Sequence, residues 1–154
     1  MLQRFKAGLV VIVLAFCVSG STSFQDASKF DEFGDVNCEA EMAHLDNFAV
    51  TLQSGPANKG VIIYYGGRRL KGRLPMRREA AARAARIRQY LVQRRGIPTN
   101  RVLMIDGGYR EAWSAELWVV PSGAGMPAPH PTIPIGKIKF RKGKPNPRDY
   151  RCGV

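Results

Sequence analysis

The pattern of apolar and polar positions predicts a first helix in the N-terminal half of the chain. Asn37 suits the N-cap of this helix, and Glu39 and Glu41 would follow in its first turn, where the helix dipole favours acids. Residues 54–56, Ser-Gly-Pro, would end it. One face of the helix is apolar, because four residues fall at the positions i, i+3, i+4 and i+7: Leu45, Phe48, Ala49 and Leu52.

A second helix is expected to begin at Pro75, which suits the first helical position, and to run to about Arg95. Gly96 would stop it, and Pro98 would prevent the helix from resuming. Its core face, at the helical period, comprises Ala80, Ala84, Ile87 and Leu91.

Four segments have the patterns of strands. A short candidate covers residues 30–36, and two continuous apolar runs cover residues 61–65 and 102–105. Apolar and polar residues alternate over residues 115–119, and Gly107-Gly108 would turn the chain just before this last strand. The order β-α-β-α-β-β predicts an α+β fold, a two-layer sandwich in which two helices pack on one mixed sheet.

The N-terminus has the pattern of a secretory signal peptide over residues 1–23. Two basic residues precede an apolar run over residues 7–18, and small residues continue from there to Ser23. The run is shorter than the roughly 20 apolar residues that cross a bilayer, which favours cleavage over a retained anchor. Cys17 raises a lipoprotein alternative, which the bulky residue before it disfavours.

Positive charge is concentrated in two parts of the 154-residue chain, which carries a formal net charge of +12. Twelve basic residues and one acid lie between Arg68 and Arg101, within a predicted domain over residues 24–121. The Pro-rich tail, residues 122–154, adds seven basic residues against one acid. Such segregation favours an anionic partner over the alternative of a merely solvated helix face. Exported proteins meet anionic cell-wall polymers and lipid headgroups more often than genomic DNA, so nucleic acid is disfavoured.

Cleavage of the signal peptide would leave two cysteines, Cys38 and Cys152. An even pair in an exported chain favours a disulfide over the alternative of two free thiols. The bond would close a loop of more than one hundred residues, for which loop-closure entropy gives at most roughly 4 to 5 kcal/mol of stabilisation.

Arg83 is a candidate ligand anchor, because it lies about 40° from Ile87 on the second helix, at the margin of the core face. A half-buried arginine there needs a partner, and the alternative to a ligand is an ion pair with Glu116 or Asp106. The preceding loop, Gly66, Gly67, Arg68 and Arg69, is rich in glycine and arginine. Its backbone N–H groups and guanidinium groups are suited to holding an anion.

The second helix, with the turn and the strand after it, resembles that part of the OmpA-like peptidoglycan-associated domains. The resemblance is carried by residues 79–92, by the turn Gly96-Ile97-Pro98 and by the strand opening at Arg101-Val102. With the order of the other elements, it extends over roughly residues 30–121. It implies the same α+β fold and a role in the bacterial cell envelope.

In OmpA-like domains, an Asp in the loop after the second strand and an Arg on the second helix clamp the diaminopimelate of the peptidoglycan stem peptide. Arg83 falls on the Arg position. The Asp position falls within the loop of residues 66–69, which contains no acid. Diaminopimelate is zwitterionic, so the missing acid would have paired with its ammonium group. Either the site takes a purely anionic ligand, or the fold persists without this binding.

Motifs of catalytic and metal centres are absent from the sequence. It contains no Gly-x-Ser-x-Gly, no His-Glu-x-x-His and no cysteine pair at metal-binding spacing. The two histidines are His44, on the first helix, and His130, in the tail, where no rigid shell is expected to hold it. Asp106 at a strand end is a single acid without a predicted partner. We therefore expect no catalytic residue, no metal and no cofactor.

The combined expectation is an exported, non-enzymatic binding domain in the periplasm or cell envelope of a bacterium. Its partner would be peptidoglycan or another anionic envelope polymer, held by the loop of residues 66–73 and the near end of the second helix with Arg83, with an anionic membrane surface as a further partner. The alternative is a basic interaction module for anionic polymers, lipid headgroups or nucleic acid. A third hypothesis is a structural domain that meets another protein through an exposed apolar face around Tyr65, Trp113 or Trp118.

Overall fold

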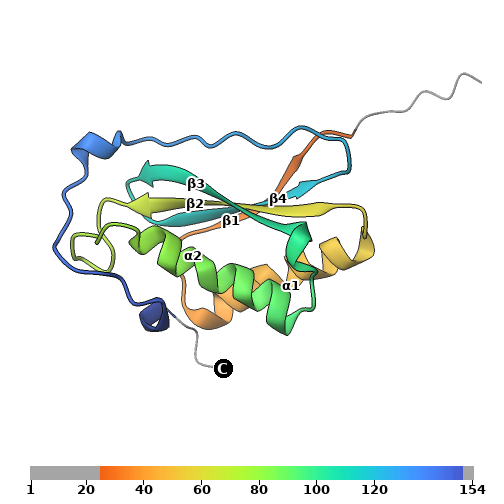
Figure 1. Ribbon diagram of the computed structural model, residues 1–154, viewed down its shortest axis with the longest axis horizontal. Helices are drawn as coiled ribbons and strands as arrows, with labels where there is room; N and C mark the ends of the chain where they lie inside the picture. The colour runs from red at the N-terminus through yellow and green to blue at the C-terminus, as the bar shows by residue number, and fades with distance from the viewer. Residues whose placement is uncertain (1–24, 151–154) are drawn as a thin grey trace, which may run out of the picture.

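The computed structural model describes residues 25–150, in which two helices cover one face of a four-stranded sheet (Figure 1). The order predicted from the sequence, β-α-β-α-β-β, is confirmed. The predicted signal peptide and Cys152 lie outside the described residues. The main elements are β1 (Ser28–Phe33), α1 (Cys38–Ser54), β2 (Lys59–Gly67), α2 (Glu79–Gln89), β3 (Val102–Arg110) and β4 (Ser114–Val120).

The sheet is mixed, with the strand order β1-β4-β2-β3. β2 pairs with β3 in parallel, and β4 lies antiparallel to β1 and β2, between them. The main core fills the space between this sheet and the two helices, where Phe48, Leu52, Ile62, Ile87 and Leu117 are fully buried. None of the helices among residues 25–150 is long and apolar enough to span a bilayer.

The first helix begins and ends as its sequence predicts. Asn37 caps α1, because its side chain accepts a hydrogen bond of 2.8 Å from the backbone N–H of Ala40. Gly55 comes directly after the last helical residue. The apolar face of α1 is buried at Leu45, Phe48, Ala49 and Leu52.

The second helix begins four residues later than expected, at Glu79 instead of Pro75. Tertiary contacts hold the preceding segment in an irregular path, because the backbone oxygen of Pro75 accepts a 3.0 Å hydrogen bond from the N–H of Arg141 in the tail. Arg78 then adopts a left-handed conformation with φ of 65° just before the helix. At its other end α2 continues as a π-helical turn, Tyr90–Arg94, before Gly96.

Gly107 and Gly108 do not turn the chain, because they lie inside β3. They form a β-bulge, at which the pairing with β2 moves from Tyr64 opposite Asp106 to Gly66 opposite Tyr109. Gly108 has a φ of 81°, which only glycine adopts readily. The hairpin to β4 comes after Arg110.

The Pro-rich tail packs along the other face of the sheet (Figure 1). The backbone N–H groups of Thr132 and Ile133 both donate to the oxygen of Tyr109 at 3.0 Å, and Ile133 is buried. The N–H of His130 donates to the hydroxyl of Tyr65 at 3.1 Å. The tail then turns past the start of α2 and ends, in the described part, beside the start of α1 (Figure 1). The two helices and the tail therefore enclose the sheet from both sides.

The position of the tail bears on the predicted disulfide. Tyr150, two residues before Cys152, lines the same pocket as Cys38 at the start of α1. We expect protein from oxidising extracts to migrate differently on denaturing gels with and without reductant, because a Cys38–Cys152 disulfide would make the denatured chain more compact. Identical mobility, with Cys38 and Cys152 both alkylated before reduction, would contradict the pairing.

Candidate functional site

Arg83 lies on α2 and is more deeply buried than the helical wheel predicts, with only 3% of its surface exposed. Its Nη2 pairs with Oδ1 of Asp35 at 2.6 Å, and its guanidinium lies over the Trp113 ring at 3.9 Å from the centroid. Neither Glu116 nor Asp106 contacts it. The partner that the sequence required is therefore Asp35, in the connection between β1 and α1.

Part of the guanidinium has no partner. The Nε and Nη1 atoms of Arg83 and the Nε1 atom of Trp113 are buried, and none has a hydrogen-bond acceptor among the described residues. Burial lowers the pKa of Arg83, and the charges and hydrogen bond of Asp35 oppose that shift. An arginine keeps its proton at neutral pH even so. This cluster thus combines a buried positive charge with N–H donors that lack acceptors, which favours an anionic group nearby.

Residues 66–69, which the sequence predicts to be an anion-binding loop, do not form one continuous loop, because Gly66 and Gly67 belong to β2. Gly66 and Gly67 are buried at the end of β2, where their lack of a side chain makes room for the chain itself. A Cβ atom on Gly67 would lie 2.6 Å from the backbone nitrogen of Trp113, and one on Gly66 would meet the Tyr109 ring. No ligand is needed to explain these glycines.

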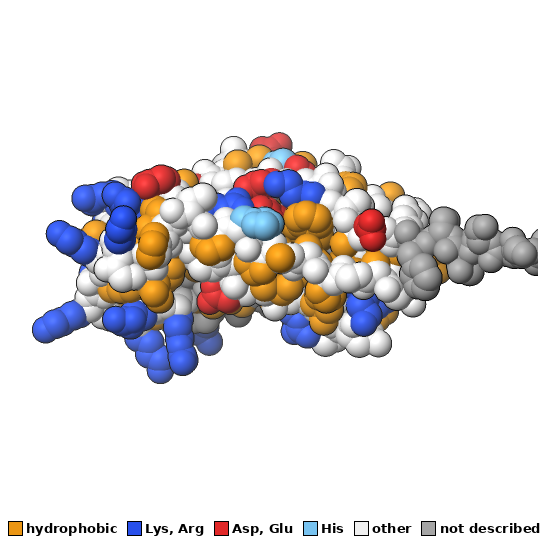
Figure 2. Space-filling view, turned by 90° about the horizontal axis from the view of Figure 1, so that it is seen from above, with side chains coloured by type: hydrophobic (Ala, Val, Ile, Leu, Met, Phe, Trp, Pro, Cys, Tyr) orange, Lys and Arg blue, Asp and Glu red, His pale blue; other side chains and the backbone are white. Residues whose placement is uncertain are grey.

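Arg68 and Arg69 are exposed, and neither contacts Arg83. Lys and Arg side chains gather at one end of the molecule, the left end in Figure 2. Arg68 pairs with the exposed Glu111 at 3.3 Å. Arg69 donates to the backbone oxygen of Gly72 at 3.1 Å, within its own loop. Two later residues of the same loop, Lys71 and Arg73, line a pocket together with Arg83.

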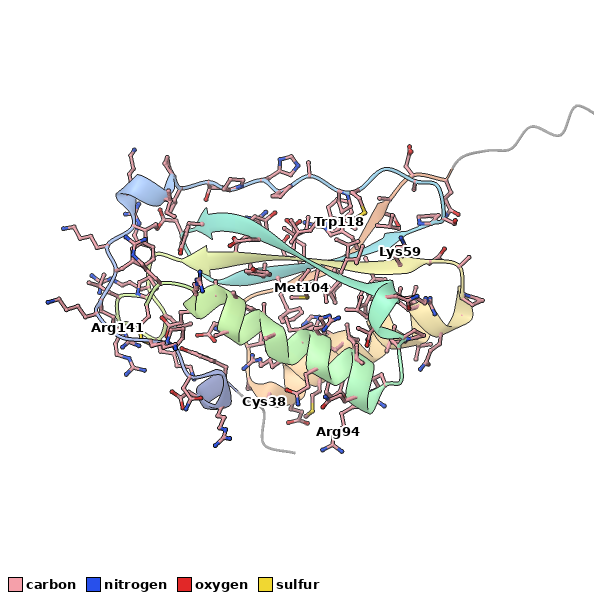
Figure 3. All side chains as sticks on the ribbon, viewed as in Figure 1. Cys38, Lys59, Arg94, Met104, Trp118 and Arg141 are labelled. Carbon is pink, nitrogen blue, oxygen red and sulfur yellow. The ribbon has the colours of Figure 1, made fainter. Side chains whose placement is uncertain are left out.

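A pocket of about 680 Å³ opens beside Arg83. Its walls come from four segments: the β1–α1 connection with Asp35, the loop after β2, α2, and the end of the tail, where Arg141 lies in Figure 3. Basic side chains outnumber acidic ones on these walls. The basic lining residues are Lys71, Arg73, Arg83, Arg86, Arg141 and Lys144, and the acidic ones are Asp35, Glu79 and Asp149.

Two buried carboxylates fix the side of the pocket formed by the helices and the tail. Glu41 on α1 is held by two hydrogen bonds from Arg86 on α2, the one from Nε being 2.7 Å long. Arg86 also donates to the backbone oxygen of Tyr150. Glu79 accepts from the backbone N–H of Met76 at 2.7 Å and from the Tyr150 hydroxyl at 2.6 Å. Because these charged groups are already paired within the fold, they hold the walls of the pocket in place and are not available to bind a ligand.

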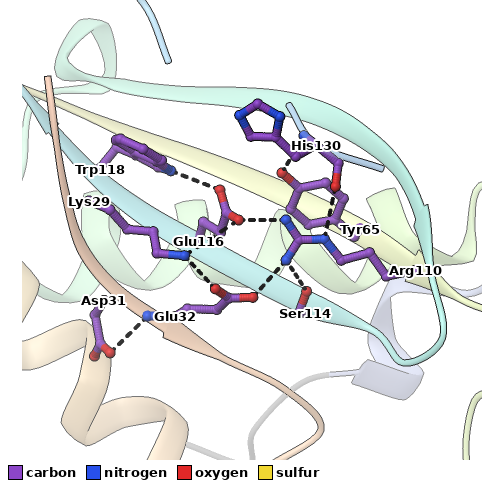
Figure 4. Close-up of polar contacts among 9 residues, drawn as sticks. All are labelled: Lys29, Asp31, Glu32, Tyr65, Arg110, Ser114, Glu116, Trp118 and His130. Carbon is purple, nitrogen blue, oxygen red and sulfur yellow. Dashed lines mark hydrogen bonds and ion pairs between the residues drawn. The ribbon is translucent and has the colours of Figure 1, made fainter. Parts of the chain in front are cut away.

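A second group of charges lies under the tail on the opposite face of the sheet (Figure 4). Arg110 donates to Glu116 at 2.6 Å and to Glu32 at 2.7 Å, and its guanidinium lies 3.5 Å from the centroid of the Tyr65 ring. The Trp118 indole donates to Glu116 at 3.0 Å. These donors have their acceptors within the fold, so this group explains the stability of the sheet and does not form a site.

The three residues that suggested an exposed apolar face, the third hypothesis, are buried or half-buried in the structure. Tyr65 and Trp113 are almost fully buried, at 0% and 2% exposure. Trp118 faces the tail side of the sheet and is half-buried. The helix residue His44 contacts Asp31 at 2.5 Å and stacks on Phe33, which is a structural role.

No family model matches this sequence, and no curated protein shows significant similarity to it. The site must therefore be interpreted from its own geometry. The sequence indicated Arg83 and the loop up to Arg73, but it did not indicate Asp35 or Arg141 as neighbours of Arg83. Asp35 belongs to an acidic run and comes two residues before the N-cap of α1, so the sequence places an acid near the start of that helix. Nothing in the sequence indicates that this acid pairs with Arg83.

Proposed function

We propose that this chain is an exported, non-enzymatic domain of the bacterial cell envelope that binds a carboxylate of peptidoglycan through Arg83. The observation that carries the proposal is the guanidinium of Arg83, which is buried against Trp113 with two nitrogens that lack acceptors among the described residues. It lies on the wall of a pocket whose lining is mainly basic. A carboxylate matches the fork of N–H donors that arginine presents.

Asp35 supplies the acid that is missing from the loop after β2. Its side chain lies 2.6 Å from Arg83 and keeps 37% of its surface exposed at the pocket. A zwitterionic group such as diaminopimelate carries an ammonium beside its carboxylate, so Asp35 would attract the ammonium while Arg83 binds the carboxylate. The resemblance of α2 to the peptidoglycan-associated domains supports the same assignment of Arg83.

The test is co-sedimentation of residues 24–154 with purified sacculi at low and high salt. Arg83→Ala and Arg83→Lys should each weaken binding about 10- to 100-fold, because a charge-assisted hydrogen bond in a buried site is worth about 1.5–3 kcal/mol. The lysine variant keeps the charge and loses the fork, which separates geometry from net charge.

Arg94→Ala is the matched control, because Arg94 is an exposed arginine at the far end of the same helical segment (Figure 3). Circular dichroism of each variant checks the fold. Binding that survives high salt and is lost only in the Arg83 variants supports the proposal. Equal binding by the Arg83 and Arg94 variants, or loss of all binding at high salt, contradicts it.

A further inference from the structure

The loop after β2 and the second half of the tail together form a strongly basic end of the molecule (Figure 2). The two segments lie side by side, because Arg141 bonds to Pro75 and the guanidinium of Arg77 lies 4.7 Å from the centroid of the Phe140 ring. Neither residues 68–78 nor residues 135–144 contain an acid. Ten basic residues of the two segments are exposed: Arg68, Arg69, Lys71, Arg73, Arg77, Arg78, Lys137, Lys139, Lys142 and Lys144.

Few of these charges are used by the fold. Arg68 pairs with Glu111, Arg69 bonds to its own loop, and Arg77 stacks on Phe140. The side chains of the other seven make no ion pair or hydrogen bond within residues 25–150. Repulsion among them is a cost that an anionic surface would relieve.

An apolar cavity of about 520 Å³ opens at this same end, between the start of α2, the end of β3 and the tail. Arg77 and Arg78 stand among its lining residues, and the one acid there, Asp106, accepts a 2.9 Å hydrogen bond from the N–H of Gly108. Ile135 lines the cavity and has 61% of its surface exposed. The other lining residues are mainly apolar: Ala80, Ala81, Tyr109, Pro131, Ile133, Pro134 and Phe140.

We propose that this basic end docks on the surface of an anionic phospholipid membrane. The exposed lysines and arginines bind lipid phosphates, and Ile135 enters the interface beside the apolar cavity. A single-stranded nucleic acid is bound by cations together with aromatic rings free to stack on bases. Duplex phosphates are bound by cations alone, which would leave the exposed Ile135 unexplained, so the combination fits a lipid surface better. Here the exposed apolar side chain is aliphatic, and the Phe140 ring is covered by Arg77 and packs against Tyr109 at 5.7 Å between centroids.

Sedimentation of residues 24–154 with vesicles tests this surface, because that chain lacks the apolar N-terminal run that would itself enter a bilayer. We expect binding to phosphatidylcholine vesicles that contain phosphatidylglycerol, weakening as salt rises, and none to phosphatidylcholine alone. Each basic residue near such a surface contributes about fivefold in affinity, so Lys137→Ala/Lys139→Ala should weaken binding about 10- to 30-fold. Ile135→Asn should weaken it a further few-fold.

The matched control is Lys59→Ala/Arg94→Ala, which removes the same charge from exposed positions away from the basic end (Figure 3). It should change vesicle binding by less than about twofold if docking is local. Equal weakening by the two double variants would overturn the proposal. So would displacement by free glycerol phosphate, or tighter binding to a DNA duplex than to the vesicles at the same salt. Lys137→Ala/Lys139→Ala should leave binding to sacculi at high salt unchanged, because neither lysine lines the pocket with Arg83, so this proposal and the peptidoglycan proposal can be contradicted separately.

Discussion

Arg86→Ala is expected to lower the free energy of unfolding by about 3–5 kcal/mol, because it leaves a buried carboxylate without its partner. Glu41 is only 2% exposed, and both of its oxygens accept hydrogen bonds from Arg86. Arg86 also donates to the backbone oxygen of Tyr150, so its loss removes one of the contacts that hold the end of the described tail against α2. Urea denaturation at neutral pH, followed by circular dichroism, measures the change.

The control for this prediction is Arg95→Ala. Arg95 pairs with Asp46 in the same way between the two helical segments, but each side chain of that pair is 39% exposed. Solvent screens an exposed ion pair, so it contributes little to stability, and Arg95→Ala should be nearly neutral. The double variant Glu41→Leu/Arg86→Met removes both buried charges and should recover most of the lost stability. Equal costs for Arg86→Ala and Arg95→Ala would contradict the assignment.

Arg110→Met is expected to cost about 3 kcal/mol at neutral pH, the lower end of the range for a broken buried pair. Glu116 is 3% exposed, and after the change its remaining positive neighbour is Lys29, at 3.7 Å. Burial alone would raise the pKa of Glu116. Hydrogen bonds from Arg110 and Trp118 and the charges of Arg110 and Lys29 outweigh burial and lower the pKa below its usual 4.5.

The lowered pKa sets the pH dependence of this effect. A carboxyl with a depressed folded-state pKa stabilises the protein above the unfolded-state pKa, and the contribution is lost as pH falls through the folded-state value. Without Arg110, burial should instead raise the pKa of Glu116. The difference in unfolding free energy between the two proteins should therefore be largest at neutral pH. It should begin to shrink as pH falls through the raised pKa of Glu116 in the variant and keep shrinking until pH passes the lowered pKa in the parent protein.

Urea denaturation of the two proteins at neutral and acidic pH measures this difference. Lys29→Met is the control, because Lys29 is 42% exposed and should contribute less than about 1 kcal/mol to the same carboxylate. A cost for Arg110→Met that does not change with pH would mean that Glu116 is not the group left unpaired.

The binding predictions depend on residues that are far apart in the sequence. Arg83 was identified from its angle on a helix, which depends only on the helical period. Its partner Asp35 could not be identified in the same way, because an acid in the β1–α1 connection meets α2 only after both helices pack on the sheet. The same holds for Arg141, which reaches the pocket after the tail crosses the sheet.

The differences from the expected fold have a common cause. Pro75 is a suitable first helical residue, but its carbonyl is held by Arg141, and the helix starts later. Gly107 and Gly108 are suitable turn residues, but the pairing of β3 with β2 continues past them as a bulge. In both places a local preference gave way to a contact made by a distant segment.

The sequence by itself determined the apolar faces of both helices, the four strands, their order along the chain and the segregation of charge. These properties arise from periods of two and 3.6 residues and from composition, which are local. The tertiary structure alone decided that β4 lies between β1 and β2, that the tail covers the second face of the sheet, and that Asp35 meets Arg83. Those outcomes depend on which distant segments pack together, and the local periodicity of the sequence carries no information about that.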